Sequence, residues 1–206
     1  MTPERIPQPE IHPKSIYILG VDPARSGKDE TAFVVLEQLF KDPTNIFVSY
    51  IETIDQSGLD VVINRIKYLD KIFRFKKIII DETGLGGGVV DVVKNEVKTP
   101  VEGIWYTNKS KNEMFNNLKL LMSKKRLFFP DYNLNHSAIC KKLYFQFLSI
   151  QKIPAKVDTG TESTKITHNA KSHDDLINAL ALACTYFNLR KRLNNRYNLI
   201  GKSKGV

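Results

Sequence analysis

The order of strand-like and helix-like segments limits this chain to few folds. Three consecutive segments, 15–22, 31–40 and 45–54, are rich in β-branched and aromatic residues and are separated by turn-forming residues, which predicts three strands in an antiparallel meander. Helical spacing of apolar residues over 59–73 then gives way to the continuous apolar run 76–81, which is typical of a strand covered on both faces. This order predicts an α/β protein with a mixed sheet, antiparallel in its first three strands and then parallel, flanked by helices.

A fifth strand is predicted at 99–106, so the sheet is expected to be five-stranded. A chain of 206 residues, 42% of them hydrophobic, suffices for one ordinary domain. We expect an N-terminal extended arm or linker at 1–15, the domain at 16–190, and a basic, flexible tail at 191–206. The other predicted segments are a glycine loop at 84–88, helices over 89–97, 111–125, 134–150 and 172–189, a short strand or bend at 127–130, and a hairpin or mobile loop at 151–171.

The charge favours a polyanionic partner. Lysine and arginine number 31 against 22 acids, a formal net charge of +9, and nucleic acid is the first candidate for such a basic domain. A solvated lysine-rich surface is the alternative. No apolar run is long enough for a membrane span, and the N-terminus lacks the apolar region of a secretory signal. Cys140 and Cys184 lie in apolar helical patterns and are expected to be reduced core thiols, which suits a cytosolic compartment.

Four acids stand where an apolar element ends or begins. Asp22 closes the first strand, Asp81 closes the run 76–81, and Asp174 and Asp175 open the last helix. Sites in open α/β sheets lie beyond the carboxyl ends of the parallel strands, so Asp22 and Asp81 meet if their strands are neighbours. Clustered carboxylates repel unless cations hold them, and hard oxygen ligands suit Mg²⁺ or Mn²⁺. Two such ions stabilise both oxygens of a phosphodiester displacement.

Each acid also has a purely structural interpretation. Asp22 precedes a proline and could simply open a turn, and Asp81 could cap the helix or loop that follows it. Ser172 and Asp175 have the spacing of a capping box, and acids are favoured at the positive end of a helix. The structural interpretation explains each acid alone, whereas the metal hypothesis explains the set.

Three segments resemble, in order, the motifs of viral terminase nucleases. The first is GVDPARSGKDETAFVVLE (20–37), a strand-end Asp, a Gly-containing loop and a second strand. The second is IIIDETGLGGGVVDVV (78–93), in which a strand-end acid precedes a glycine-rich turn into a helix. The third is KSHDDLINALALACTY (171–186), His-Asp-Asp at the start of an Ala/Leu-rich helix. The resemblance covers residues 16 to about 190 and is to the nuclease half of a terminase large subunit, in the RNase H-like (RuvC-like) superfamily.

The resemblance implies an RNase H-like fold and an endonuclease that cuts concatemeric viral double-stranded DNA with two divalent ions, Mg²⁺ or Mn²⁺. It implies that Asp22 bridges both ions, that Asp81 holds one, and that Asp174 and Asp175 complete the site. RuvC-type relatives often carry a further Asp where this chain has Asn178, which could bond the site but supplies no charge. His173 could contact a phosphate or orient an acid.

The two adjacent helix acids are not expected to act alike. Neighbours on a helix point about 100° apart, so Asp174 and Asp175 cannot aim equally at one ion. Asp175 shares a face with Asn178, and this spacing resembles the last acid and following turn of RuvC-type nucleases. We therefore expect Asp175 to be the closer ligand and Asp174 the assisting one.

Partners follow from the same resemblance. A terminase works with an ATPase motor domain, a small terminase subunit and a portal, in the cytoplasm of the infected host cell. The sequence has no G-x-x-x-x-G-K-[ST] phosphate loop, so the chain is interpreted as an isolated nuclease half or a small stand-alone relative. The candidates for contacts to the DNA backbone are Arg25, Lys28, Lys109, Lys111, Lys165 and Lys171.

Three other functions stay open on the sequence alone. A Holliday-junction resolvase of the RuvC type, or another RNase H-like nuclease, would have the same fold. An actin-like or sugar-kinase ATPase would use 21–35 and 80–88 as phosphate loops, but it needs two lobes and a far longer chain. A catalytically dead binding module would explain the basic charge and leave the ordered acids unexplained.

Overall fold

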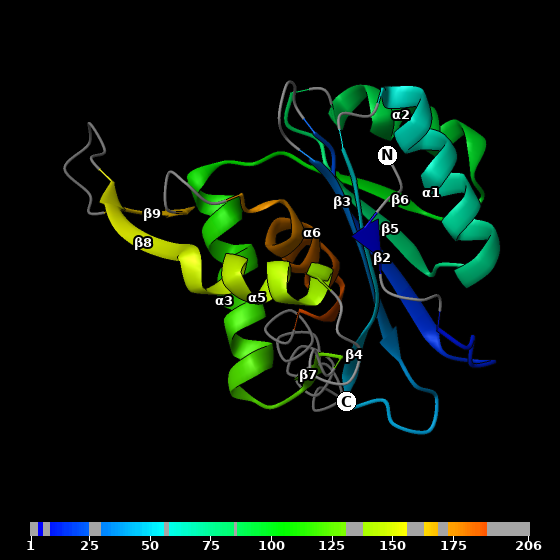
Figure 1. The fold of residues 1–206 in the computed structure, drawn as a ribbon, viewed down its shortest axis with the longest axis horizontal. Coiled ribbons are helices and arrows are strands. Elements are labelled where there is room, and N and C mark those ends of the chain that lie inside the picture. The colour runs from blue at the N-terminus through cyan, green and yellow to red at the C-terminus, as the bar shows by residue number, and fades with distance from the viewer. Residues whose placement is uncertain are drawn as a thin grey trace, which may run out of the picture.

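The computed structural model describes residues 4–5, 9–24, 30–55, 58–84, 86–130, 138–155, 163–168 and 173–188 (Figure 1). The strands are β1 (Glu4–Arg5), β2 (Ile16–Asp22), β3 (Glu30–Gln38), β4 (Ile46–Asp55), β5 (Lys77–Asp81), β6 (Val101–Ile104), β7 (Leu127–Phe128), β8 (Ile150–Ala155) and β9 (Ser163–His168). The helices are α1 (Leu59–Phe73), α2 (Gly86–Glu96), α3 (Asn108–Ser123), α5 (Ala138–Ser149), α6 (Asp175–Cys184) and the 3₁₀ helix η1 (Thr185–Phe187).

The main sheet has the strand order β1-β4-β3-β2-β5-β6, with β7 also paired to β4. Strands β2, β3 and β4 form the predicted antiparallel meander, and β5 and β6 run parallel to β2. The predicted mixed sheet of five main strands is confirmed. The short strands β1 and β7, of two residues each, extend it to seven. Strand β7 lies within the short strand or bend predicted at 127–130, whereas β1 is too short to carry a periodic signal in the sequence.

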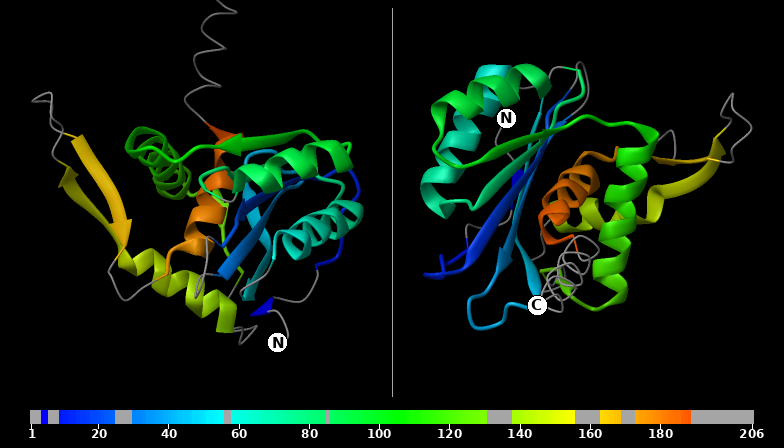
Figure 2. Two further views of the ribbon diagram at one scale, coloured as in Figure 1. Left: turned by 90° about the horizontal axis from the view of Figure 1, so that it is seen from above. Right: turned by 180° about the vertical axis from the view of Figure 1, so that it is seen from behind.

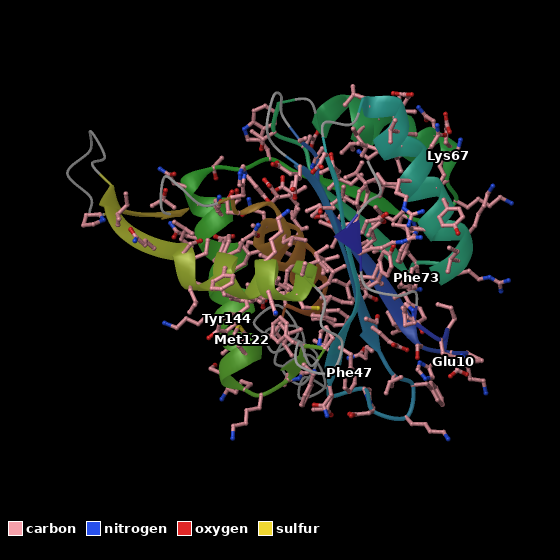
Figure 3. All side chains as sticks on the ribbon, in the orientation of Figure 1. Glu10, Phe47, Lys67, Phe73, Met122 and Tyr144 are labelled. Atoms are coloured by element: carbon pink, nitrogen blue, oxygen red, sulfur yellow. The ribbon has the colours of Figure 1, made fainter. Side chains whose placement is uncertain are left out.

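Helices cover both faces of this sheet (Figures 1 and 2). Helices α1 and α2 lie on one face, and α6 lies on the other, with α3 and α5 packed beside it. On the α1 face, Phe73 is buried, and its ring centroid lies 5.4 Å from that of Tyr17 and 5.8 Å from that of Tyr50 (Figure 3). The central strands are therefore apolar on both sides, as the continuous apolar runs of the sequence predicted.

Several element boundaries differ from the prediction. The segment 84–88 is not a loop throughout, because α2 already begins at Gly86. A Cβ on Gly86 would lie 1.8 Å from the carbonyl oxygen of Asp81, so the glycine lets this helix start against the end of β5. Helix α3 begins at Asn108, three residues earlier than predicted, because Thr107 and Ser110 form a capping box.

The segment after α5 forms a β-hairpin. The sequence had predicted either a hairpin or a mobile loop there, and the hairpin is confirmed. Strands β8 and β9 pair antiparallel from Ile150 opposite His168 to Ala155 opposite Ser163, and they project away from the main sheet (Figure 1). The last helix is shorter than predicted. It ends as an α-helix at Cys184 and continues as η1.

The predicted arm includes β1, which pairs Glu4 with Thr53 and Arg5 with Glu52. The predicted tail at 191–206 lies outside the described residues, so the division into arm, domain and tail stays a prediction. Cys140 and Cys184 are buried and form no disulfide within the described structure, as predicted for reduced core thiols. Among the described helices, none combines the length and the apolar character that crossing a bilayer requires.

Candidate active site

The first two acids lie side by side at one edge of the sheet. The parallel register of β2 and β5 places Val21 opposite Ile80, so Asp22 and Asp81 are the next residues on two neighbouring strands. Both side chains are buried, with 7% of Asp22 and 1% of Asp81 exposed. The sequence made the meeting of the two acids conditional on their strands being neighbours, and this register shows that the strands are neighbours.

A glycine brings the last helix onto this edge. A Cβ on Gly20 would lie 2.0 Å from the carbonyl oxygen of Ala179, so only a residue without a side chain lets α6 pack this closely on β2. Side chains alternate along a strand, so Asp22 faces the same side as Gly20 and therefore the start of α6. The Asn178 side-chain amide donates a hydrogen bond of 3.0 Å to Oδ2 of Asp22.

The helix acids do not form the capping box that was one structural alternative. The N-cap of α6 is Asp174, which makes no side-chain cap hydrogen bond, and Asp175 is the first helical residue. A capping-box acid belongs three residues after the cap, so that interpretation of Asp175 is wrong. Ser172 lies outside the described residues. Asp175 remains favourable at the positive end of the helix dipole.

The acids act on one another electrostatically. The pKa of the Asp22 carboxyl lies well above its usual range, chiefly because the group is buried, and then because the charges of Asp81 and Asp175 repel its ionised form. The charge of Asp174 adds to this shift, whereas the hydrogen bond from Asn178 opposes it. All four predicted acids therefore contribute to one electrostatic site, which a bound cation would stabilise.

A lysine and a histidine border this group of acids. Nζ of Lys111 lies 3.0 Å from Oδ2 of Asp174, and both side chains are largely buried. Nδ1 of His173 lies 3.9 Å from Oδ2 of Asp175, and the histidine side chain is about half exposed. Lys111, predicted as a DNA contact, thus pairs with a site acid, and sequence reasoning missed this because the two residues are 63 positions apart.

Thr83 is a second residue that sequence reasoning missed. Its backbone N–H donates a 2.8 Å hydrogen bond to Oδ1 of Asp81, and its hydroxyl accepts a 2.9 Å hydrogen bond from the backbone N–H of Tyr106. An Asp that bonds the N–H two residues on is a common turn, so the segment Asp-Glu-Thr carried a usable signal. The turn holds one oxygen of Asp81 and connects the ends of β5 and β6.

The donor set fits a hard divalent cation. In the described part of the chain, no three His, Cys, Asp or Glu side chains already form a closed metal-binding group. The charges of Asp81, Asp175 and Asp174 nevertheless act on buried Asp22. Oδ1 of Asn178 is also buried, with no hydrogen-bond partner in the described structure. Mg²⁺ and Mn²⁺ bind through carboxylate and amide oxygens, so these residues suit such an ion.

The other predicted DNA contacts are only partly placed. Lys109 is exposed on α3, and Lys165 belongs to β9. Arg25, Lys28 and Lys171 lie outside the described residues. An open groove of about 440 Å³ beside the acids was not predicted; it is lined by Ala138, Lys141, Lys142, Phe145, Gln146 and His173.

The meander, the two parallel strands and the helix across β2 make up the RNase H-like fold that solved structures share with this chain. A family model described as the terminase RNaseH-like domain matches residues 19–187. The chain therefore belongs to the terminase RNaseH-like domain family. This is the family that the three sequence motifs predicted, in preference to an actin-like ATPase.

The solved structures agree in fold. The large terminase nuclease from thermophilic phage G20c, with bound magnesium, has a TM-score of 0.71 at 18% identity and covers 88% of this chain and 87% of its own. The Sf6 large terminase nuclease domain, a mutant with manganese and β-thujaplicinol, has a TM-score of 0.56 at 12% identity. The match covers 82% of this chain and 87% of the Sf6 domain. The bacteriophage HK97 large terminase has a TM-score of 0.55 at 11% identity, and the match covers 87% of this chain and 40% of the HK97 chain. No curated protein sequence matches this chain.

Proposed function

We propose that this chain is a metal-dependent endonuclease that cuts double-stranded, concatemeric viral DNA during genome packaging. The family makes it a terminase nuclease domain, and the observation that carries the finer proposal is the convergence of acids on buried Asp22. Its ionised form is disfavoured by burial and by Asp81 and Asp175. A buried group of like charges is unfavourable for the fold alone, whereas it suits a site completed by cations.

Two divalent ions, Mg²⁺ or Mn²⁺, would be held by Asp22, Asp81 and Asp175, with Asp174 assisting. Bound there, such ions stabilise the attacking and leaving oxygens when a phosphodiester is hydrolysed. The G20c nuclease with magnesium and the Sf6 domain with manganese support this choice of ions.

The surrounding residues of the chain would position the acids. Asn178 holds Oδ2 of Asp22 through its amide, and the Thr83 backbone holds Oδ1 of Asp81. Each of these bonds restricts the rotation of a planar carboxylate, so it also restricts the position of the second oxygen, which would bind the metal. His173, beside Asp175, would orient that acid or contact a phosphate.

The DNA backbone would be bound without sequence readout. The net charge of +9 supports an electrostatic attraction to phosphates. Lys141, Lys142 and His173 line the same groove, and His173 lies 3.9 Å from Asp175. A duplex lying along this groove would present a phosphate to the acids. We propose the six predicted cations as further backbone contacts: Arg25, Lys28, Lys109, Lys111, Lys165 and Lys171.

The larger assembly is part of the same proposal. The chain spans 40% of the HK97 large terminase, and the complete machine would add an ATPase motor domain, a small terminase subunit and a portal, in the host cytoplasm. These partners would deliver DNA to the site, whereas the cutting chemistry is assigned to this domain.

The test is cleavage of supercoiled plasmid by the purified chain with Mn²⁺, with Mg²⁺, with Ca²⁺, and with EDTA. We expect nicked and linear products with Mn²⁺ or Mg²⁺ and none with EDTA. Ca²⁺ should support little cutting, because its looser coordination misaligns the attack. An Asp22→Asn preparation made in parallel controls for contaminating nucleases. Undiminished cutting in EDTA by the wild-type chain, absent from the Asp22→Asn chain, would exclude the metal mechanism.

A further inference from the structure

Lys111 occupies an unusual place for a lysine. It lies in the first turn of α3, where the positive end of the helix dipole disfavours a cation. Only 20% of its side chain is exposed, although a lysine is rarely so buried unless it is paired. Neither helix propensity nor surface solubility explains a largely covered cation at this position.

Three groups hold the Lys111 ammonium. Oδ2 of Asp174 lies 3.0 Å away, and the nitrogen stands 5.6 Å from the ring centroid of Tyr106 and 5.9 Å from that of Phe115. The aromatic faces favour a cation, and they position it at the border of the acid site. Asp174 in turn is close enough to Asp22 to affect its ionisation, so the lysine pairs with a member of the site itself.

A carboxylate oxygen that already accepts from an ammonium is a weaker ligand for a metal ion. We propose that Lys111 is a positioning residue that holds Asp174 back from the metal in the absence of DNA, and that releases it when a DNA phosphate takes up the ammonium. The inference rests on the proposed nuclease function. This role of Lys111 would explain how Asp174 assists. It would also make binding of the second divalent ion depend on the presence of the DNA substrate.

The coupling follows from simple exchange. Without DNA, the ammonium and a divalent ion compete for Oδ2 of Asp174. With DNA bound, a phosphate oxygen offers the ammonium an equivalent negative partner, and Asp174 becomes available to the ion. Because binding linkage is reciprocal, metal should then strengthen DNA binding to the same extent that DNA strengthens metal binding.

The first test titrates the full chain with Mn²⁺ in a calorimeter, without DNA. Lys111→Met removes the charge and keeps an apolar stem beside the rings of Tyr106 and Phe115. We expect it to bind Mn²⁺ roughly three- to tenfold more tightly than the wild type, because one repelling and competing cation is gone. Lys111→Arg should resemble the wild type. Lys119→Met is the matched control, since it removes an exposed lysine from the same helix and should change the affinity less than about twofold.

The second test measures duplex DNA binding with and without Ca²⁺, which permits binding with little cutting. Ca²⁺ should strengthen DNA binding by the wild type and by Lys119→Met, and should do so several-fold less for Lys111→Met. An unchanged or weaker Mn²⁺ affinity together with an unchanged effect of Ca²⁺ would overturn the inference. Lys111→Gln gives a second neutral variant if Lys111→Met does not fold.

The two levels of the proposal fail differently. If the wild type cuts DNA with Mn²⁺ and the lysine variants bind metal as it does, the role of Lys111 is wrong and the nuclease function stands. If the wild type neither binds Mn²⁺ nor cuts DNA, the proposed function fails and the inference fails with it.

Discussion

Each face of the sheet buries a carboxylate, but the charged groups around the two carboxylates differ. On the α1 face, Glu52 is fully buried, and its Oε2 accepts a 2.7 Å bond from Nε of Arg65 and a 3.2 Å bond from the hydroxyl of Tyr50. On the α6 face, Asp22 accepts a bond from the neutral amide of Asn178, and the charges that act on it are those of other acids. Glu52 therefore has its own internal counter-cation, whereas the charged groups that act on Asp22 are other acids.

This difference separates a structural acid from a candidate functional one. A buried negative charge is tolerated when a cation of the protein pairs with it. Removing that cation leaves the buried charge uncompensated and destabilises the fold. A buried group of like charges instead disfavours ionisation until an external cation arrives.

Removing a site acid should abolish activity and spare the fold. We expect Asp22→Asn and Asp81→Asn each to lower plasmid cleavage by roughly a thousandfold or more, the scale of losing direct charge stabilisation at a reacting phosphate. The melting temperature without metal should be unchanged or higher, because repulsion among the acids falls. DNA binding should be retained or tightened. If either variant cuts at near the wild-type rate, that acid is only a turn residue.

Removing the cation on the other face should do the reverse. Arg65→Met leaves Glu52 buried without its ion pair, so we expect about 3 kcal/mol less stability in urea unfolding. The folded fraction should still cut DNA at the wild-type rate. Lys67→Met is the control, because Lys67 pairs with Glu96 on the exposed side of α1 (Figure 3) and should cost less than about 1 kcal/mol. Equal losses for both variants would contradict the contrast between the pairs.

The stability of the metal-free protein should depend on pH through Asp22. An unfolded Asp has a pKa of about 3.9, and the pKa of Asp22 in the folded chain is higher. Between these two values the folded state binds more protons, so the contribution of Asp22 is complete below about pH 4 and is lost as pH rises through the folded pKa. Melting in EDTA across this range measures the loss. The Asp22→Asn variant should show a flatter profile, and an identical profile would locate the titration elsewhere.

The groove beside the acids should contribute modestly to DNA binding. Lys141→Gln removes one exposed cation from the groove, and we expect the slope of log affinity against log salt to fall by about one unit. Lys94→Gln, on α2 and therefore on the opposite face, should leave the slope unchanged. Equal slopes in both variants would mean that DNA does not follow this groove.

Local patterns were enough to predict most of the architecture. The strands of the meander, α1, β5 and the hairpin were predicted close to their observed bounds, because apolar periodicity and turn residues are properties of neighbouring positions. The starts of α2 and α3 were predicted less well. Gly86 and Thr107 decide those starts through a close backbone approach and a capping box, which are details finer than the apolar pattern.

The sequence by itself determined that acids stand at the ends of apolar elements, since an acid after an apolar run is visible in the chain. Only the tertiary structure decided which groups meet. The close packing of Gly20 against Ala179 places Asn178 within hydrogen-bond distance of Asp22. Lys111 contacts Asp174, which is 63 positions away in the sequence. Likewise, the pairing of Glu52 with Arg65 depends on α1 lying over β4. The physical reason is that burial and charge pairing depend on distance in space, which no local spacing of residues specifies.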